Sequence, residues 1–200
     1  MLGWSEGERE KRRGLGLRFR LYFRGSLPAN GSPKQKWRLR EAFSSQLEAL
    51  WTQEPLCHIQ KFRDSSLHQN ECYLAEARNG ITYFPVISER IYTLAEIDIL
   101  MLRPGSPGFI TVGGGDIDNR LKTLLDALQP PNSTDTYKPD SLDLAAPISC
   151  LLQDDKLITR INVETDRLLD EPANSNEVVL IISVHVRASS GRMCNIGIAS

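Results

Sequence analysis

The stretch GGGDIDNRLKTLLDALQ, residues 113–129, begins with three glycines and two aspartates and continues as an amphipathic segment. Its leucines follow the i, i+3, i+4, i+7 spacing of one helix face: Leu121, Leu124, Leu125 and Leu128. This spacing predicts a helix that starts near Asp118. Asp118, Lys122 and Asp126 are four residues apart, so they project from one side of that helix, opposite or beside the leucines.

Asp116 and Asp118 are two residues apart at the predicted helix start, so their carboxylates can point the same way in an extended segment. Two convergent carboxylates suit a hard cation such as Mg²⁺ or Mn²⁺. A second interpretation needs no metal: one aspartate caps the helix, the other interacts with the helix dipole, and Lys122 forms a salt bridge. The stretch alone leaves both interpretations open. An EF-hand is excluded, because Leu121 and Ala127 stand where its loop requires glycine and glutamate.

A second acidic motif, LLQDDKLI at residues 151–158, places Asp154 and Asp155 side by side at a predicted strand entrance. A turn that favours aspartate explains this pair on its own. If the pair meets Asp116 and Asp118 at one end of a sheet, however, the carboxylates repel one another unless a cation is bound. The two motifs together therefore favour a metal site.

The two motifs resemble those of RusA-type Holliday-junction resolvases, which carry D-x-D-N-x-x-K-x-x-x-D-A-L and then D-D before a strand. The resemblance covers residues 113–129 and 151–164. The residues that match the first motif are Asp116, Asp118, Asn119, Lys122, Asp126, Ala127 and Leu128. The chain departs from the family at Gly115, where proline is common, and in the longer loop from Gln129 to Gln153.

The resemblance implies a Mg²⁺-dependent, dimeric endonuclease that cleaves branched DNA, with Mn²⁺ as an alternative cation. The metal ligands that it implies are Asp116, Asp118 and Asp155, and Lys122 is expected to assist catalysis. Asn119 and Asp154 are expected to support the metal site. Two alternatives remain: a nucleic-acid-binding module of the same fold without turnover, and a structural or interaction protein in which the aspartates are helix caps.

The charge of the chain is distributed unevenly. Residues 1–40 hold eleven Lys or Arg and three Glu, whereas the rest of the chain is acidic. A basic arm on an acidic body is consistent with an anionic partner such as nucleic acid, although charge alone favours a solvated, partly disordered tail. The side chains expected to contact DNA are Lys34, Lys36, Arg38 and Arg120. Trp37, among these cations, is expected either to stack on a base or simply to pack.

The remaining segments predict an α+β domain with one mixed sheet and two main helices. Leu15–Phe23 alternates as a strand, Ser32 and Pro33 start a helix that runs to Trp51, and Asn79-Gly80 predicts a tight hairpin. Arg90–Pro104 is a long predicted strand, and the apolar run Glu177–Val186 is expected at the centre of the sheet. The predicted organisation is a disordered basic arm at 1–14, one RusA-like domain at 15–188 and a loose tail at 189–200.

The cysteines and the hydropathy indicate the compartment. Four scattered cysteines favour reduced thiols in the cytoplasm. No apolar run reaches about 18 residues and no secretory h-region is seen, so neither a membrane span nor a signal peptide is expected. A zinc site from Cys57, His58, His68 and Cys72 is disfavoured, because the first two are adjacent.

Overall fold

The computed structural model describes residues 16–64, 72–104, 117–140, 143, 146–171, 176–195 and 197–198. Its regular elements are β1 (Arg18–Ser26), α2 (Pro33–Trp51), β2 (Glu76–Arg78), β3 (Ile81–Ile87), β4 (Thr93–Arg103), α3 (Ile117–Leu128), β5 (Ile148–Leu152), β6 (Ile158–Arg167) and β7 (Glu177–Ala188). Three short 3₁₀ helices are η1 (Leu56–Arg63), η3 (Glu89–Ile91) and η5 (Asp155–Leu157). The predicted α+β class is confirmed.

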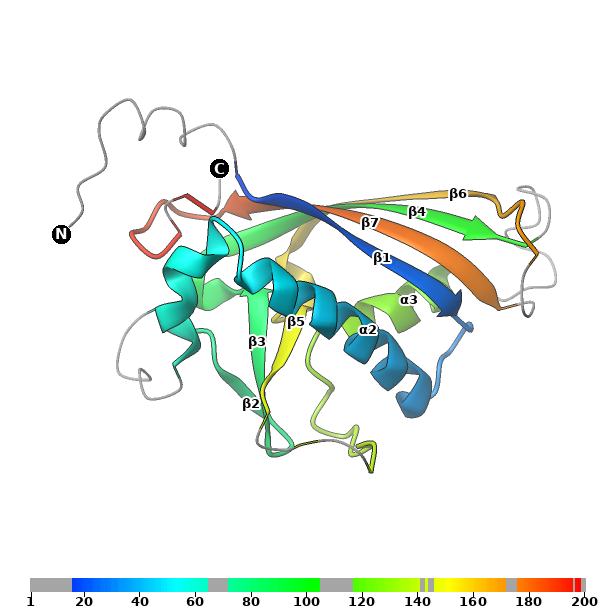
Figure 1. Ribbon diagram of the computed structural model, residues 1–200, viewed down its shortest axis with the longest axis horizontal. Coiled ribbons are helices and arrows are strands. Elements are labelled where there is room, and N and C mark those ends of the chain that lie inside the picture. The colour runs from blue at the N-terminus through cyan, green and yellow to red at the C-terminus, as the bar shows by residue number, and fades with distance from the viewer. Residues whose placement is uncertain are drawn as a thin grey trace.

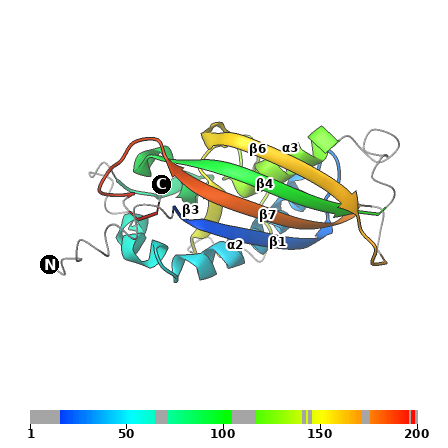
Figure 2. The same cartoon turned by 90° about the horizontal axis from the view of Figure 1, so that it is seen from above.

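The larger sheet has four strands in the order β1-β7-β4-β6. β7 pairs antiparallel with both β1 and β4, and β6 pairs parallel with β4. β7 is therefore central, as its nearly continuous apolar sequence predicts. Figure 2 shows these four strands side by side, with α2 and α3 behind them.

A second sheet, with the order β2-β3-β5, corrects the expectation of a single mixed sheet. Its outer strand β5 was not expected as a separate element. β5 is buried along nearly its whole length. A strand that is buried on both faces lacks the alternation by which a half-buried strand is recognised in sequence.

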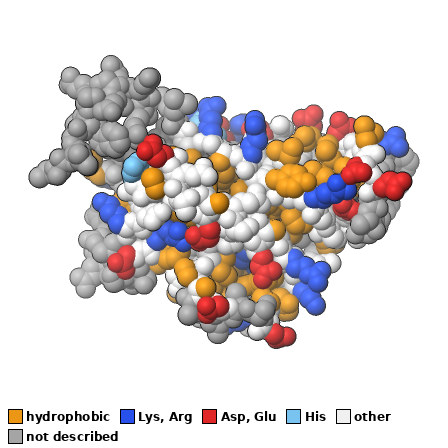
Figure 3. Space-filling view, in the orientation of Figure 1, with side chains coloured by type: hydrophobic (Ala, Val, Ile, Leu, Met, Phe, Trp, Pro, Cys, Tyr) orange, Lys and Arg blue, Asp and Glu red, His pale blue; other side chains and the backbone are white. Residues whose placement is uncertain are grey.

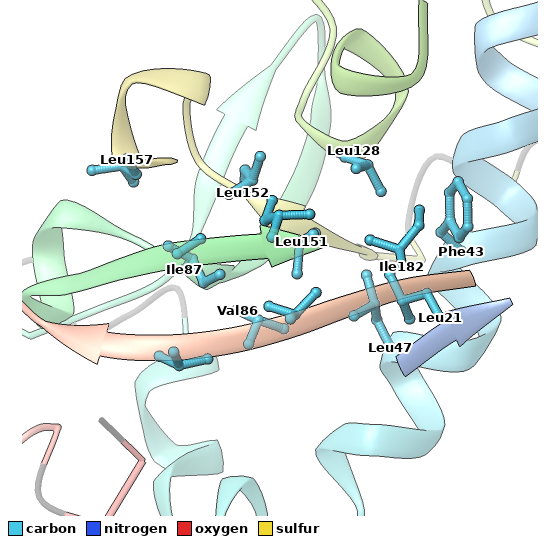
Figure 4. Close-up of a cluster of buried hydrophobic side chains, with 14 of the residues drawn as sticks. Leu21, Phe43, Leu47, Val86, Ile87, Leu128, Leu151, Leu152, Leu157 and Ile182 are labelled. Carbon is cyan, nitrogen blue, oxygen red and sulfur yellow. The ribbon is translucent and has the colours of Figure 1, made fainter. Parts of the chain in front are cut away.

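The helices and the second sheet cover one face of the four-stranded sheet, as Figure 1 shows. Between these layers lies a continuous apolar core that draws side chains from both sheets and both helices. Figure 4 shows part of this core, with Leu21 and Ile182 from the larger sheet facing Phe43 and Leu47 of α2. No helix of the described residues covers the other face of the larger sheet.

Two local sequence signals are confirmed in detail. Ser32 caps α2 and forms a reciprocal capping box with Gln35, and Pro33 occupies the first helical position. Asn79 and Gly80 have φ angles of 51° and 75° between β2 and β3. Positive φ at both central residues is what a type I′ hairpin requires.

The C-terminal segment, expected to be loose, packs against the core instead. Cys194 and Ile198 are buried, and the Leu17 N–H donates to the Ile198 carbonyl. The Asn195 amide donates to the carbonyls of Ile91 and Ser190. These contacts are long-range, so the local sequence gives no sign of them. The expected basic arm, residues 1–14, lies outside the described residues.

None of the helices in the described part of the chain is long and apolar enough to cross a membrane.

Gly31 joins the loop before α2 to α3. Its N–H donates to Thr123 Oγ1 over 2.9 Å, and a Cβ at this position would lie 2.5 Å from Thr123 Cγ2. We therefore expect Gly31→Ala to lower the free energy of unfolding by about 1–3 kcal/mol, as overpacking of a close contact does. Urea denaturation measures the loss. The matched control is Gly191→Ala, where no atom lies within 4 Å of the added methyl group, and it should change stability little.

Candidate functional site

α3 buries one side and exposes the other. Leu124, Ala127 and Leu128 are buried in the core. Asp118 and Lys122, one turn apart, are exposed. No ion pair joins them, and Lys122 has no ion-pair partner elsewhere among the described residues. The salt bridge required by the cap-and-bridge interpretation is therefore not formed.

Arg120 holds the start of α3 against the larger sheet. It is only 2% exposed, and its Nη1 donates to the Leu27 carbonyl while its Nη2 donates to Asn176 Oδ1 over 3.1 Å. Leu27 and Asn176 themselves pair where β1 ends and β7 begins. Burial, and secondarily the nearby Arg103, lowers the pKa of the Arg120 guanidinium.

The expectation that Arg120 belongs to a DNA-contacting surface is corrected by this burial. The side chain is committed to backbone and amide oxygens inside the protein, so it cannot reach a phosphate without leaving them. Arg120 lies within the helical motif, and its type alone did not reveal that it points inward. Its role is to position α3.

Two cations from α2 hold the other end of α3. Lys36 Nζ lies 2.7 Å from Asp126 Oδ2. Arg40 is 2% exposed and donates to the carbonyls of Asp126 and Gln129 over 2.9 and 3.1 Å. The last carbonyls of a helix have no partners within it, and they carry partial negative charge. α3 has no basic residue in its own last turn, so α2 supplies the cations that complete it.

An open pocket of about 550 Å³ lies beside this junction, lined by α2 and by the loop after α3. Lys36, Arg40 and Asp126 all contribute to its wall. Burial lowers the pKa of the Arg40 guanidinium, and its Nη1 has no hydrogen-bond partner among the described residues. Because the charges in this wall are largely paired with one another or with α3, the pocket is better explained as part of the helix junction than as an anion site.

Asp155 lies near the C-terminal end of α3, and Asp118 lies at the N-terminal end. The Asp155 N–H donates to Gln129 Oε1 over 3.1 Å, and Gln129 directly follows the helix. Eleven residues separate Asp118 from Gln129, which corresponds to about 16 Å along a helix axis. Within one chain, the structure therefore does not bring Asp155 together with Asp118.

The other expected metal residues have mixed outcomes. Asp116 and the three glycines before it lie outside the described residues. Asn119 is half-buried on the first turn of α3. Asp154 caps η5, because its carboxylate accepts a hydrogen bond from the Lys156 N–H over 3.0 Å. No group of three or more His, Cys, Asp or Glu side chains with metal-binding spacing exists among the residues that the structure describes.

The expected DNA contacts on α2 divide in a similar way. Lys34 and Arg38 are exposed, whereas Lys36 is held by Asp126. Trp37 is buried, its ring lies beneath the Arg40 guanidinium, and its Nε1 donates to Glu41. Of its two expected roles, packing is the one that the structure shows.

Comparison with known proteins adds no relative: no family model, no curated protein and no solved structure matches the chain.

The sequence analysis did not identify Arg40, which lies on α2 and donates hydrogen bonds to the carbonyls at the end of α3. The only available signal was its spacing of four from Lys36, which places both cations on one side of α2. That spacing does not identify the partner, because Asp126, whose carbonyl accepts from Arg40, is 86 residues away along the chain.

Replacement of Arg40 tests this junction. We expect Arg40→Met to lower the free energy of unfolding by about 1–3 kcal/mol, because two carbonyls lose a charged donor in a buried setting. Thermal or urea denaturation measures the effect. Arg38→Met, two residues earlier on the exposed side of the same helix, is the control and should be nearly neutral. Equal stability of the two variants would show that the hydrogen bonds from Arg40 to the end of α3 contribute nothing to stability.

Proposed function

We propose that this protein is a divalent-metal-dependent endonuclease that acts on branched DNA. The observation that carries the proposal is the start of α3, where Asp118 and Lys122 are exposed on a helix whose first turns are anchored in the core by Arg120. A catalytic group is most effective when the element that carries it is rigid. The resemblance of residues 113–129 to the RusA motif supplies the reaction class.

The donor set suits a hard cation. Asp118 offers carboxylate oxygens at an exposed position, and Asp116, two residues earlier, is the proposed second ligand. Mg²⁺ is commonly held by one or two carboxylates and completes its coordination with water and substrate phosphate. The chemistry that a bound Mg²⁺ or Mn²⁺ supplies is activation of water and neutralisation of charge on the scissile phosphate.

The chain's own residues have separate roles in this proposal. The Lys122 ammonium group, one turn from Asp118, stabilises the additional negative charge that develops on the phosphate during hydrolysis. Asn119 orients a carboxylate or a water beside it. Asp154 and Asp155, which the resemblance assigns to the same site, lie near the other end of α3 and have no assigned role within a single chain.

DNA binding is proposed for the exposed cations at the start of α2. Lys34 and Arg38 are available to phosphates, because neither is tied to a described acid. Phosphate contacts of this kind give salt-dependent binding without sequence preference. A four-way junction has approximate two-fold symmetry, so a symmetric dimer is the assembly that would nick two of its strands equivalently.

The position of Asp155 favours one alternative, a nucleic-acid-binding module that does not cut. If the metal site requires a third carboxylate in the same chain, the structure does not supply Asp155 near Asp118. Such a module would bind a four-way junction in the presence of Mg²⁺ and release it intact.

The variant Asp118→Asn tests the nuclease. Asp118 is an exposed residue in the first turn of α3, and asparagine keeps its size, so the fold should be nearly unchanged. Removal of the charge should reduce Mg²⁺-dependent cleavage of a synthetic four-way junction by at least about 100-fold, since metal assistance is worth several kcal/mol. DNA binding, measured by mobility shift in EDTA, should remain close to that of the wild type.

Glu171→Gln is the matched control, because it removes the same charge at an exposed position outside the site. It should cleave at the wild-type rate. Unchanged cleavage by Asp118→Asn would refute the proposed site. A wild-type chain that binds the junction but never cuts it, with either Mg²⁺ or Mn²⁺, would support the binding module instead.

A further inference from the structure

The two edge strands of the larger sheet, β1 and β6, differ in whether the rest of the chain hydrogen bonds to their outer backbone groups. At the β1 edge, the Tyr22 N–H donates to Gln46 Oε1 over 2.9 Å, and the Tyr22 carbonyl accepts from Gln46 Nε2 over 2.8 Å. A side chain of α2 therefore occupies backbone groups that a further strand would need. Arg18 and Arg20 also project from β1, so two β1 strands would repel each other.

Within the described part of the chain, the β6 edge is open. β6 is the last strand of its sheet and pairs only with β4. Apart from the Arg167 N–H, which donates to Oδ1 of the neighbouring Asp166 near the end of the strand, no backbone group on its outer edge is hydrogen bonded to a described residue. Most of its ten residues are exposed, including Ile161, at 39%. A long exposed edge strand with apolar residues is a template for pairing with another strand.

We propose that β6 pairs antiparallel with β6 of a second copy of this chain, with Val163 opposite Val163 at the two-fold axis. The two four-stranded sheets then form one continuous sheet of eight strands. Figure 2 shows β6 at the border of the sheet, with no other labelled strand beyond it. The inference is independent of nuclease activity and identifies the surface through which two copies associate.

The charges of β6 are self-complementary in this register. Arg160 and Asp166 lie on the outer face of the sheet, three residues either side of Val163, so each stands opposite the other across the axis. Asn162 stands opposite Glu164 in the same way. In the chain itself Arg160 already binds Asp98 over 2.8 and 3.0 Å, so its guanidinium is held on the outer face. Opposite charges in facing positions stabilise an antiparallel pair.

The inner face of the same strand is apolar or β-branched. Ile161 stands opposite Thr165 across the axis, and Val163 stands opposite its own copy. Such pairs fit a pleated surface well, and they cover the exposed Ile161.

Neighbouring registers are less favourable. An axis at Glu164 places this glutamate opposite itself, which is repulsive. An axis at Asn162 pairs Arg160 with Glu164, but it leaves Asp166 opposite the apolar Ile158, without a cation. Sliding one strand past the other by a single residue would bring inner-face side chains opposite outer-face ones, so the register is strongly specified. The sequence of β6 is complementary to itself when two copies pair antiparallel, and for this reason we assign a second copy of the chain as the partner.

Disulfide trapping tests the axis. Val163→Cys should form a covalent dimer under mild oxidation, and peptide mapping should find the two introduced thiols linked to each other, apart from the four native cysteines. Thr159→Cys is the matched control on the same strand. Its two copies would be about 26 Å apart along the ladder, which is too far for a disulfide. Absence of the Val163→Cys link, or equal linking by Thr159→Cys, overturns the proposal.

The dissociation constant of the dimer, measured without DNA or metal, provides a second test. Asp166→Arg places two arginines opposite each other at both ends of the pair, so the dimer should dissociate about tenfold more readily in sedimentation experiments. Glu171→Arg makes the same change of charge beyond the strand and should leave association unchanged. A wild-type chain that sediments as a monomer throughout the micromolar range, or equal effects of the two variants, refutes the β6 interface.

Discussion

Burial of the Arg120 guanidinium is the constraint on which the arrangement of the site depends. A buried charged group is costly unless it is hydrogen bonded, and here Nη1 and Nη2 donate to Leu27 and Asn176 at the end of the β1–β7 pair, while Nε has no partner among the described residues. α3 therefore cannot rotate without breaking these contacts. Asp118 and Lys122 are exposed because Arg120 points inward from the same helix.

The two ends of α3 have opposite electrostatic character as a result. At its start an acid and a lysine face solvent, whereas at its end Lys36 and Arg40 neutralise Asp126 and the final carbonyls. The acidic start suits a cation, which supports the proposed metal site there. The basic residues at the end serve the junction of α2 with α3, so they are not available to a DNA backbone. Figure 3 shows charged side chains of both signs over the surface, without a single continuous basic field in that view.

The larger sheet likewise has surfaces that other elements cover and surfaces that they do not. α2 closes the β1 edge through Gln46, and the helices together close one face. No described helix covers the outer face, and β6 pairs with no described strand on its outer side. A protein that acts on a large, nearly symmetric substrate can use such a surface to place two copies in a fixed relation. α3, which carries the proposed site, and β6, the proposed association surface, would then belong to two layers that pack on one core.

The sequence by itself determined the elements whose signals are local. Ser32 with Gln35, Asn79 with Gly80, and the leucine spacing of α3 each act within a few residues, so their caps, turn and helix were predicted correctly. The alternation of polar and apolar residues likewise predicted the outer strands, and the apolar run of β7 predicted its central place.

Only the tertiary structure decided which distant residues meet. It separated β5 into a second sheet, packed Ile198 into the core, turned Arg120 inward and set Asp155 beside Gln129 rather than beside Asp118. Each of these outcomes depends on contacts between residues far apart in the chain. Residue type and spacing show that a carboxylate or a guanidinium is available, but its neighbours follow from how the layers pack, because burial and long-range hydrogen bonds fix the direction in which each side chain points.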